Sequence, residues 1–212
     1  MKRVPLLKYC GNHSFEDIKV ATNSSAHYLG FVFAESKRCV TPSEVKDWLS
    51  KVKVSQKLVG VFVNASIDQI QLAVENIALD VIQCHGEETV EDILALKAVF
   101  KQKVWKVIHH SEAAIDLMKQ YEGIVDGYVI DSKVKGVRGG TGVTFDWSAI
   151  PAYKREAEKQ KVPCFIAGGI NVSTIDALLQ YDPVGIDLSS GIEVSGRKSE
   201  KIKKQFEERL SV

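Results

Sequence analysis

Residues Gly185–Glu193 read GIDLSSGIE, in which a short apolar run, Gly185–Leu188, leads into Ser189, Ser190 and Gly191. The run has the length and composition of a buried strand, and the residues after it indicate the start of a polar helix. Backbone N–H groups at such a junction can bind an anion, and two hydroxyls and a glycine allow its close approach. We therefore predict a strand that ends in a phosphate-binding loop.

The same alternation of a short β-rich run with a helical pattern recurs along the chain. The predicted strands are Val4–Cys10, Tyr28–Phe33, Leu58–Asn64, Leu79–His85, Val104–His109, Gly127–Asp131, Cys164–Gly168 and Gly185–Leu188. Strict alternation indicates a parallel sheet, because each return to a parallel neighbour needs a crossover helix. About eight units fit an α/β fold, the closed (β/α)8 TIM barrel, with an open doubly wound sheet as the alternative. No linker divides the chain, so we expect one barrel domain over residues 1–212.

Two of the intervening helices carry sequence signals for their first turns. Thr41-Pro42-Ser43-Glu44 is a capping box with proline at the first helical position, and Ser66-Ile67-Asp68-Gln69 is a second box. Apolar residues then recur at helical spacing, as Val45, Trp48, Leu49 and Val52, as Ile67, Ile70, Val74 and Ile77, and as Ile202, Phe206 and Leu210. We predict that these stripes pack against the sheet rather than bind a partner.

The composition excludes several classes of protein. With 212 residues, 45% of them hydrophobic, and a formal net charge of +1, the chain can bury one core and is not expected to bind nucleic acid. Its longest apolar runs, such as Leu58–Val63, are too short to span a membrane. The apolar stretch near the N-terminus stops at Lys8, before a signal-peptide core could form. We expect a soluble cytoplasmic protein without a membrane partner.

Neither a metal site nor a disulfide framework is indicated. The four cysteines are widely separated and include no C-x-x-C pair: Cys10, Cys39, Cys84 and Cys164. The adjacent His109 and His110 would point to opposite faces of a strand, which makes them a poor metal pair.

The active site of a barrel lies where its strands end, and polar residues occupy several of those positions. Lys8 and Cys10 share a face of the first strand, where an ammonium would favour the thiolate, the form that acts as a base. Lys8 is also a candidate substrate contact. A small core residue is the alternative for Cys10. Asp131 ends the sixth strand, where a partly apolar mouth would raise its pKa and suit it to general acid catalysis. A turn-capping aspartate is the alternative there.

Two glycine-containing loops suit a phosphate, and a third suits a cover over the substrate. Loops after strands seven and eight are the usual phosphate site of this architecture, although glycines there can also simply make tight turns. The candidates are Gly168, Gly169, Asp187, Ser189, Ser190 and Gly191. The loop Gly139-Gly140-Thr141-Gly142 lacks the Walker spacing and the dinucleotide fingerprint, so we predict a substrate-covering loop, with Gly140 and Gly142 as contacts, and no nucleotide.

Two further side chains are candidate substrate contacts. Arg38, just beyond the second strand, can bind an anion such as a carboxylate, with a solvated basic turn as the alternative. His85 ends the fourth strand and can donate a hydrogen bond to a substrate, with a structural histidine as the alternative.

Taken together, these motifs resemble those of the phosphoribosylanthranilate isomerase family over nearly the whole chain. The matching segments are Lys8-Tyr9-Cys10-Gly11, Glu16-Asp17, Gly30-Phe31-Val32-Phe33 with Ser36-Lys37-Arg38, Gly60 to Asn64, Gln83 to Glu87, Gly139 to Gly142 with Phe145-Asp146-Trp147, Ala167-Gly168-Gly169 with Asn171-Val172, and Asp187 to Glu193. The chain departs from the family's common residues at Tyr9, Cys84 and Ser199, none of which is a candidate catalytic group.

The resemblance implies a (β/α)8 barrel and a reaction. That reaction is the Amadori rearrangement of N-(5-phosphoribosyl)anthranilate to 1-(2-carboxyphenylamino)-1-deoxyribulose 5-phosphate in tryptophan biosynthesis. It involves no net redox change, so no cofactor is expected. The resemblance further implies that Cys10 is the general base, that Asp131 is the general acid, and that Arg38 holds the anthranilate carboxylate.

Two alternatives have different requirements. Another phosphate-binding barrel enzyme, such as an indole-glycerol-phosphate synthase or a sugar-phosphate epimerase, would share the phosphate loops but need a different acid/base set. A non-catalytic barrel that binds phosphorylated ligands would need neither Cys10 nor Asp131. The presence of both residues favours the isomerase.

Overall fold

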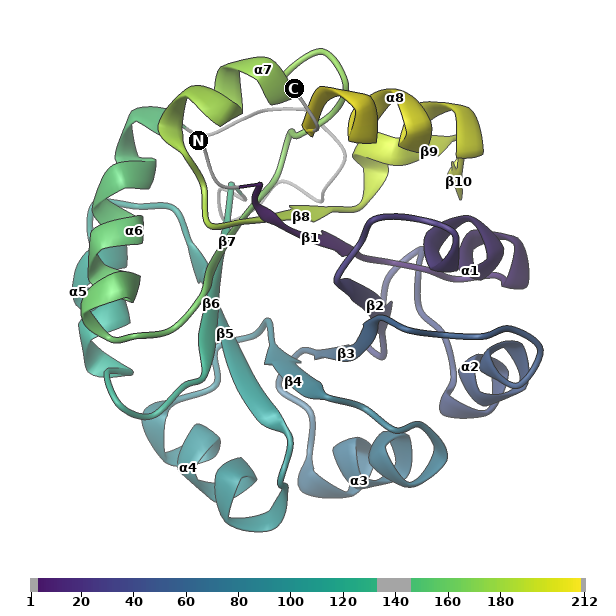
Figure 1. Cartoon of the computed structure of the whole chain (residues 1–212). Helices are drawn as coiled ribbons and strands as arrows, with labels where there is room; N and C mark the ends of the chain where they lie inside the picture. Colours follow the sequence, from purple (N-terminus) through teal and green to yellow (C-terminus); the bar gives the residue numbers. More distant parts are fainter. Residues whose placement is uncertain (1–3, 133–145, 211–212) are drawn as a thin grey trace.

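The computed structural model describes residues 4–132 and 146–210, in which eight parallel strands close into a barrel inside a ring of helices (Figure 1). Closure is direct, because β1 (Leu6–Tyr9) pairs with β2 (Tyr28–Val32) on one side and with β8 (Gly185–Leu188) on the other. The predicted barrel is therefore confirmed, and the open doubly wound sheet is excluded. Gly140 and Gly142 lie outside the described residues.

The observed elements follow the predicted alternation. The other barrel strands are β3 (Lys57–Phe62), β4 (Val81–Cys84), β5 (Lys103–His109), β6 (Gly127–Asp131) and β7 (Cys164–Ala167). The helices are α1 (Phe15–Thr22), α2 (Pro42–Leu49), α3 (Ile67–Asn76), α4 (Val90–Val99), α5 (Ala114–Gln120), α6 (Ile150–Lys159), α7 (Ile175–Leu178) and α8 (Glu200–Leu210). Short 3-10 helices are η1 (Trp147–Ala149), η2 (Leu179–Tyr181) and η3 (Ser190–Ile192), and a hairpin of β9 (Glu193–Val194) and β10 (Arg197–Lys198) lies before α8.

Local sequence chemistry begins several of these helices. The predicted capping boxes at Thr41 and Ser66 are both present, and a third, unpredicted box joins Thr89 to Asp92 at the start of α4. The predicted stripe on α3 was wrong at Ile67, which is 38% exposed. Ile67 is the first residue of that helix, beside the cap, whereas Ile70 lies one turn further on and is buried.

The alternation of side chains along the strands separates two layers of packing. One set of faces meets the surrounding helices, and the other fills the barrel interior. The interior cluster consists of Val59, Val61, Val81, Trp105, Val107, Val129 and Phe165. The same period of two then brings polar side chains to the carboxyl ends of the strands, among them Cys10, His85 and Asp131. Within residues 4–132 and 146–210, no helix has the length and apolar character needed to cross a membrane.

Candidate active site

A cavity of about 1450 Å³ opens at the carboxyl ends of the barrel strands. It gathers most of the predicted site residues in one place, although they come from loops far apart in the sequence. The predicted residues that line it are Cys10, Arg38, His85, Asp131, Gly168, Gly169, Asp187, Ser189, Ser190 and Gly191. Lys8 is fully buried and does not line it. In the part of the chain described, no group of three or more His, Cys, Asp or Glu side chains is arranged to hold a metal ion.

Cys10 is held at the end of β1 by its backbone and by a glycine. Its N–H donates to the carbonyl of Leu188 at 2.7 Å, which continues the pairing of β1 with β8 past the last strand residue. A Cβ atom at Gly30 would lie only 2.7 Å from the Cys10 Sγ. The glycine on β2 therefore provides the space that the thiol occupies.

A buried ion pair lies beneath the thiol. Lys8 and Asp187 are paired across β1 and β8, and the Lys8 Nζ donates to the Asp187 Oδ2 at 2.7 Å. Burial alone would lower the pKa of Lys8, but Asp187 and Cys10 outweigh it and raise that pKa above its ordinary value. The other carboxylate oxygen of Asp187 is buried with no hydrogen-bond partner among the described residues, and its residue lines the cavity. Lys8 was predicted as a substrate contact, but its side chain is fully buried and pairs with Asp187 instead.

Burial also decides the protonation of Cys10. It raises the pKa of the thiol, while Lys8 lowers that pKa, Asp187 raises it, and the net shift is upward. The sequence-based expectation was right about the influence of Lys8 and wrong about the net result. The thiol is therefore the resting form of Cys10, and the thiolate forms against the cost of burial.

The raised pKa predicts how Cys10 reacts with an alkylating reagent. Because only the thiolate is nucleophilic, alkylation by iodoacetamide should keep accelerating up to at least about pH 9, by close to tenfold per pH unit. Rates measured by mass spectrometry of the Cys10 peptide between about pH 6 and about pH 10 test this. Exposed Cys39 provides an internal comparison in the same sample. A Cys10 rate that levels off below about pH 8 would show a lowered pKa instead.

Asp131 lies next to His85 in the lining of the cavity. The His85 Nε2 and the Asp131 Oδ2 lie 3.4 Å apart, and both side chains are partly exposed. Glu88 holds the loop that carries His85. Its carboxylate accepts a hydrogen bond from the backbone N–H of Gly86 and pairs with the Lys106 Nζ at 2.7 Å. Sequence reasoning missed Glu88, because it stands in a polar segment where charges are usually solvated. It also missed Lys106, although a charged residue inside the predicted strand Val104–His109 was a signal for a buried ion pair.

The two predicted phosphate loops touch one another. Gly168 and Gly169 both have positive φ angles, of 87° and 68°, which only glycine adopts readily. A Cβ at Gly191 would lie 1.9 Å from the carbonyl oxygen of Ile170, so the loop after β8 packs directly on the loop after β7. η3 starts in the loop after β8, and the first N–H groups of a helix, which have no acceptor within it, can bind an anion.

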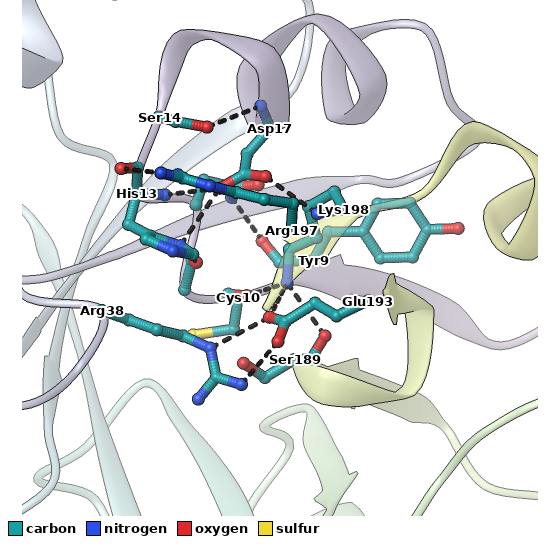
Figure 2. Close-up of polar contacts among 12 residues, drawn as sticks. Tyr9, Cys10, His13, Ser14, Asp17, Arg38, Ser189, Glu193, Arg197 and Lys198 are labelled. Atoms are coloured by element: carbon teal, nitrogen blue, oxygen red, sulfur yellow. Dashed lines mark hydrogen bonds and ion pairs between the residues drawn. The ribbon is translucent and has the colours of Figure 1, made fainter. Parts of the chain in front are cut away.

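Arg38 lines the cavity, and Figure 2 shows its side chain beside Cys10. Its side chain passes so close to Gly11 that a Cβ there would lie 2.4 Å from the Arg38 Cδ. Two of its nitrogens donate to the carboxylate of Glu193, from Nε at 2.9 Å and from Nη2 at 2.7 Å. Sequence reasoning did not single out this partner of Arg38.

A barrel with a thiol, a carboxyl group and two abutting glycine loops at its mouth has the features typical of barrel enzymes that bind phosphorylated substrates and use acid/base catalysis. Comparison with known proteins makes the assignment specific. The model of the N-(5'-phosphoribosyl)anthranilate (PRA) isomerase family matches residues 7–209. The chain belongs to this family, and the family predicted from the sequence is confirmed.

Curated relatives and solved structures agree with this membership. The N-(5'-phosphoribosyl)anthranilate isomerase of Geobacillus thermodenitrificans is 56% identical over 204 residues, covering 96% of this chain and 92% of its own. That of Bacillus subtilis is 46% identical over 207 residues, covering 98% and 95%. The crystal structure of the Thermotoga maritima enzyme superposes with a TM-score of 0.84 at 28% identity and covers 98% of each chain. A phosphoribosyl anthranilate isomerase in complex with reduced 1-(o-carboxyphenylamino)-1-deoxyribulose 5-phosphate gives 0.81 at 26% identity and the same coverage.

Proposed function

We propose that this chain isomerises N-(5-phosphoribosyl)anthranilate to 1-(2-carboxyphenylamino)-1-deoxyribulose 5-phosphate in tryptophan biosynthesis, with Asp131 as general acid and Cys10 as general base. The supporting observation is that one cavity holds the thiol, the carboxyl group and the two glycine loops. A solved relative that binds a reduced form of this product supports the choice of substrate. The reaction belongs to a biosynthetic pathway, and we propose that it takes place in the cytoplasm.

The acid acts first. Asp131 donates a proton to the furanose ring oxygen while the bond between that oxygen and the anomeric carbon breaks. The lone pair of the anilino nitrogen forms the new C=N bond, and the product of this step is an open-chain Schiff base. Because the His85 Nε2 lies 3.4 Å from the Asp131 Oδ2, we propose that His85 lies beside the ring oxygen as well.

The base acts second. The Cys10 thiolate removes the proton from the sugar carbon next to the Schiff base, and the electron pair of that C–H bond moves to give an enolamine. Tautomerisation of the enolamine to the ketone completes the isomerisation without net oxidation or reduction. The ammonium of buried Lys8 stabilises the thiolate that this step requires.

The remaining groups bind the two anionic ends of the substrate. We assign the phosphate to the loops after β7 and β8, through Gly168, Gly169, Ser190 and Gly191. Arg38, in the segment after β2, lies beside Cys10 and suits the anthranilate carboxylate. The Oδ1 of Asp187, which has no hydrogen-bond partner among the described residues, can accept a hydrogen bond from a sugar hydroxyl.

The contact between the two loops gives a test of the phosphate site. Gly191→Ala places a methyl group against the Ile170 carbonyl and should push the loops apart. We expect KM to rise by roughly tenfold or more with a smaller change in kcat, because phosphate binding holds substrate and transition state alike. Inhibition by inorganic phosphate should weaken in parallel. An unchanged KM in a variant that melts at the wild-type temperature would remove the phosphate from these loops.

Genetic complementation tests the function in a cell. A bacterial strain that lacks its own phosphoribosylanthranilate isomerase needs tryptophan in the medium. Expression of this chain should restore growth without tryptophan, and expression of Asp131→Asn should not. Absence of growth despite ample folded wild-type protein would contradict the proposed function.

A further inference from the structure

The hairpin β9–β10 brings two charged residues under the rim of the cavity. Its turn residues Ser195 and Gly196 have positive φ angles of 50° and 79°, as the tight turns of two-residue hairpins require. The strands pair Glu193 with Lys198, so that both side chains come together beside the loop after β8. Figure 2 shows Glu193 against Arg38, with Lys198, Cys10 and Ser189 next to them.

Lys198 uses each of its three N–H donors inside the protein. Its side chain is fully buried, and its Nζ donates to the carbonyl of Cys10 at 2.7 Å, to the carbonyl of Ser189 at 2.9 Å and to the Glu193 carboxylate at 2.9 Å. An ammonium has only three donors, so Lys198 is fully satisfied. It thereby joins the loop of the proposed base to the loop of the proposed phosphate site.

Glu193 is the link between Lys198 and Arg38. Its side chain is 5% exposed, and its Oε1 accepts from both Lys198 and Arg38 while its Oε2 accepts from Arg38 alone. Burial by itself would raise the pKa of Glu193, but hydrogen bonds from Arg38 and the charge of Lys198 bring it below its ordinary value. The carboxylate stays ionised and holds the planar guanidinium from one side.

The hairpin is itself fastened to the loop after β1. The backbone N–H of Lys198 donates at 2.8 Å to Asp17, which is fully buried in the first turn of α1. The second oxygen of Asp17 accepts the N–H of His13 at 3.1 Å, and Ser14 caps the same helix. Asp17 therefore fixes the position of Lys198 relative to the loop that carries Cys10.

We propose that Lys198 and Glu193 are positioning residues of the active site, Lys198 for the Cys10 loop and Glu193 for the guanidinium of Arg38. This inference rests on the proposed function, in which Cys10 removes a proton and Arg38 holds a carboxylate. Neither residue touches the reacting atoms. They act by fixing the positions of the base, the phosphate loop and the carboxylate site relative to one another.

Two variants separate the two halves of this proposal. Glu193→Gln is isosteric but uncharged, and its amide N–H₂ opposes the donors of Arg38, so Arg38 should swing free and KM should rise by roughly tenfold, more than kcat falls. Lys198→Met keeps a long apolar stem but removes the donors to the Cys10 and Ser189 carbonyls. We expect kcat to fall by roughly tenfold or more.

The reactivity of Cys10 gives a readout that a merely structural role would not move. The charged groups near the thiol include Lys8 from β1, Asp187 from β8 and Lys198 from β10, and the two lysines favour the thiolate. Arg38 and its partner Glu193 also lie beside Cys10. Lys198→Met should therefore shift the alkylation profile of Cys10 to higher pH. This measurement needs no substrate, so its result stands apart from the test of isomerase activity.

Lys203 supplies the matched control. It is also a buried lysine, on α8, but its Nζ bonds only with the Asn23 carbonyl and Glu200. Lys203→Met should leave KM, kcat and the Cys10 profile within about twofold of wild type, whatever it costs in stability. If Glu193→Gln and Lys198→Met give the same unchanged values, the positioning roles are overturned. Should Lys198→Met fail to fold, an unchanged KM in folded Glu193→Gln still overturns the link to Arg38.

Discussion

Asp131→Asn is expected to lower kcat by at least about a hundredfold, equivalent to roughly 2.7 kcal/mol of lost transition-state stabilisation. The amide has the shape of the carboxyl group but cannot transfer an acidic proton to the ring oxygen. Ring opening is the first step, so a slower ring opening slows the whole reaction, and the groups that act in later steps cannot replace the acid. Initial rates followed by loss of substrate fluorescence measure the effect.

Asp126 offers a control on the same segment of chain. It lies just before β6, at the end of the barrel remote from the cavity, and bonds with Lys97 and the N–H of Val104. Asp126→Asn should keep kcat near the wild-type value even if the protein melts at a lower temperature. Turnover of Asp131→Asn within about tenfold of wild type would remove Asp131 from the role of general acid.

Cys10→Ser is the second substitution with a large expected effect. A serine hydroxyl fits the space beside Gly30 but is far less acidic than a thiol, so it leaves the sugar proton without a base. We expect kcat to fall by at least about a hundredfold while KM changes little, since the thiol is proposed to act on the reacting carbon rather than to bind substrate.

Exposed Cys39 provides the matched substitution for the thiol. Cys39→Ser lies outside the cavity lining and should turn over as fast as wild type. A Cys10→Ser enzyme that retains near-normal kcat would show that another group takes the proton. Together with an active Asp131→Asn, that result would refute the proposed mechanism.

The barrel was predictable because its determinants are local. Short apolar runs separated by helical patterns define eight strands joined by seven crossovers, and parallel strands with that connectivity have few ways to bury both faces of their sheet. The positions of Cys10 and Asp131 at strand ends followed from the same pattern, since the carboxyl ends of all eight strands meet at one rim. Period-two alternation then aims both side chains inward.

The supporting network was not predictable, because it depends on contacts between distant loops. Glu193 and Lys198 lie in a polar segment before α8, where charges are usually solvated, and only the folded hairpin brings them beside Cys10. The position of Lys8 on the first strand was predicted correctly, but its burial was not. Packing in the folded barrel decides that Lys8 is a buried partner of Asp187 rather than a substrate contact.

The net shift of the Cys10 pKa escaped prediction for a related reason. Sequence spacing puts an ammonium two residues from the thiol, which fixes the direction of one electrostatic influence. The opposing influence is burial, whose size depends on every element around the site. Charge neighbours can be inferred along a strand, whereas desolvation becomes visible only in the assembled barrel.

The most direct test of the central claim supplies the purified wild-type chain with freshly made N-(5-phosphoribosyl)anthranilate. Loss of substrate fluorescence should be enzyme-dependent and saturable, with 1-(2-carboxyphenylamino)-1-deoxyribulose 5-phosphate as the product, identical in mass but distinct in chromatography. Cys10→Ser and Asp131→Asn should each abolish most of that rate. A folded wild-type protein that leaves the substrate unchanged, or near-normal rates in both variants, would contradict the account.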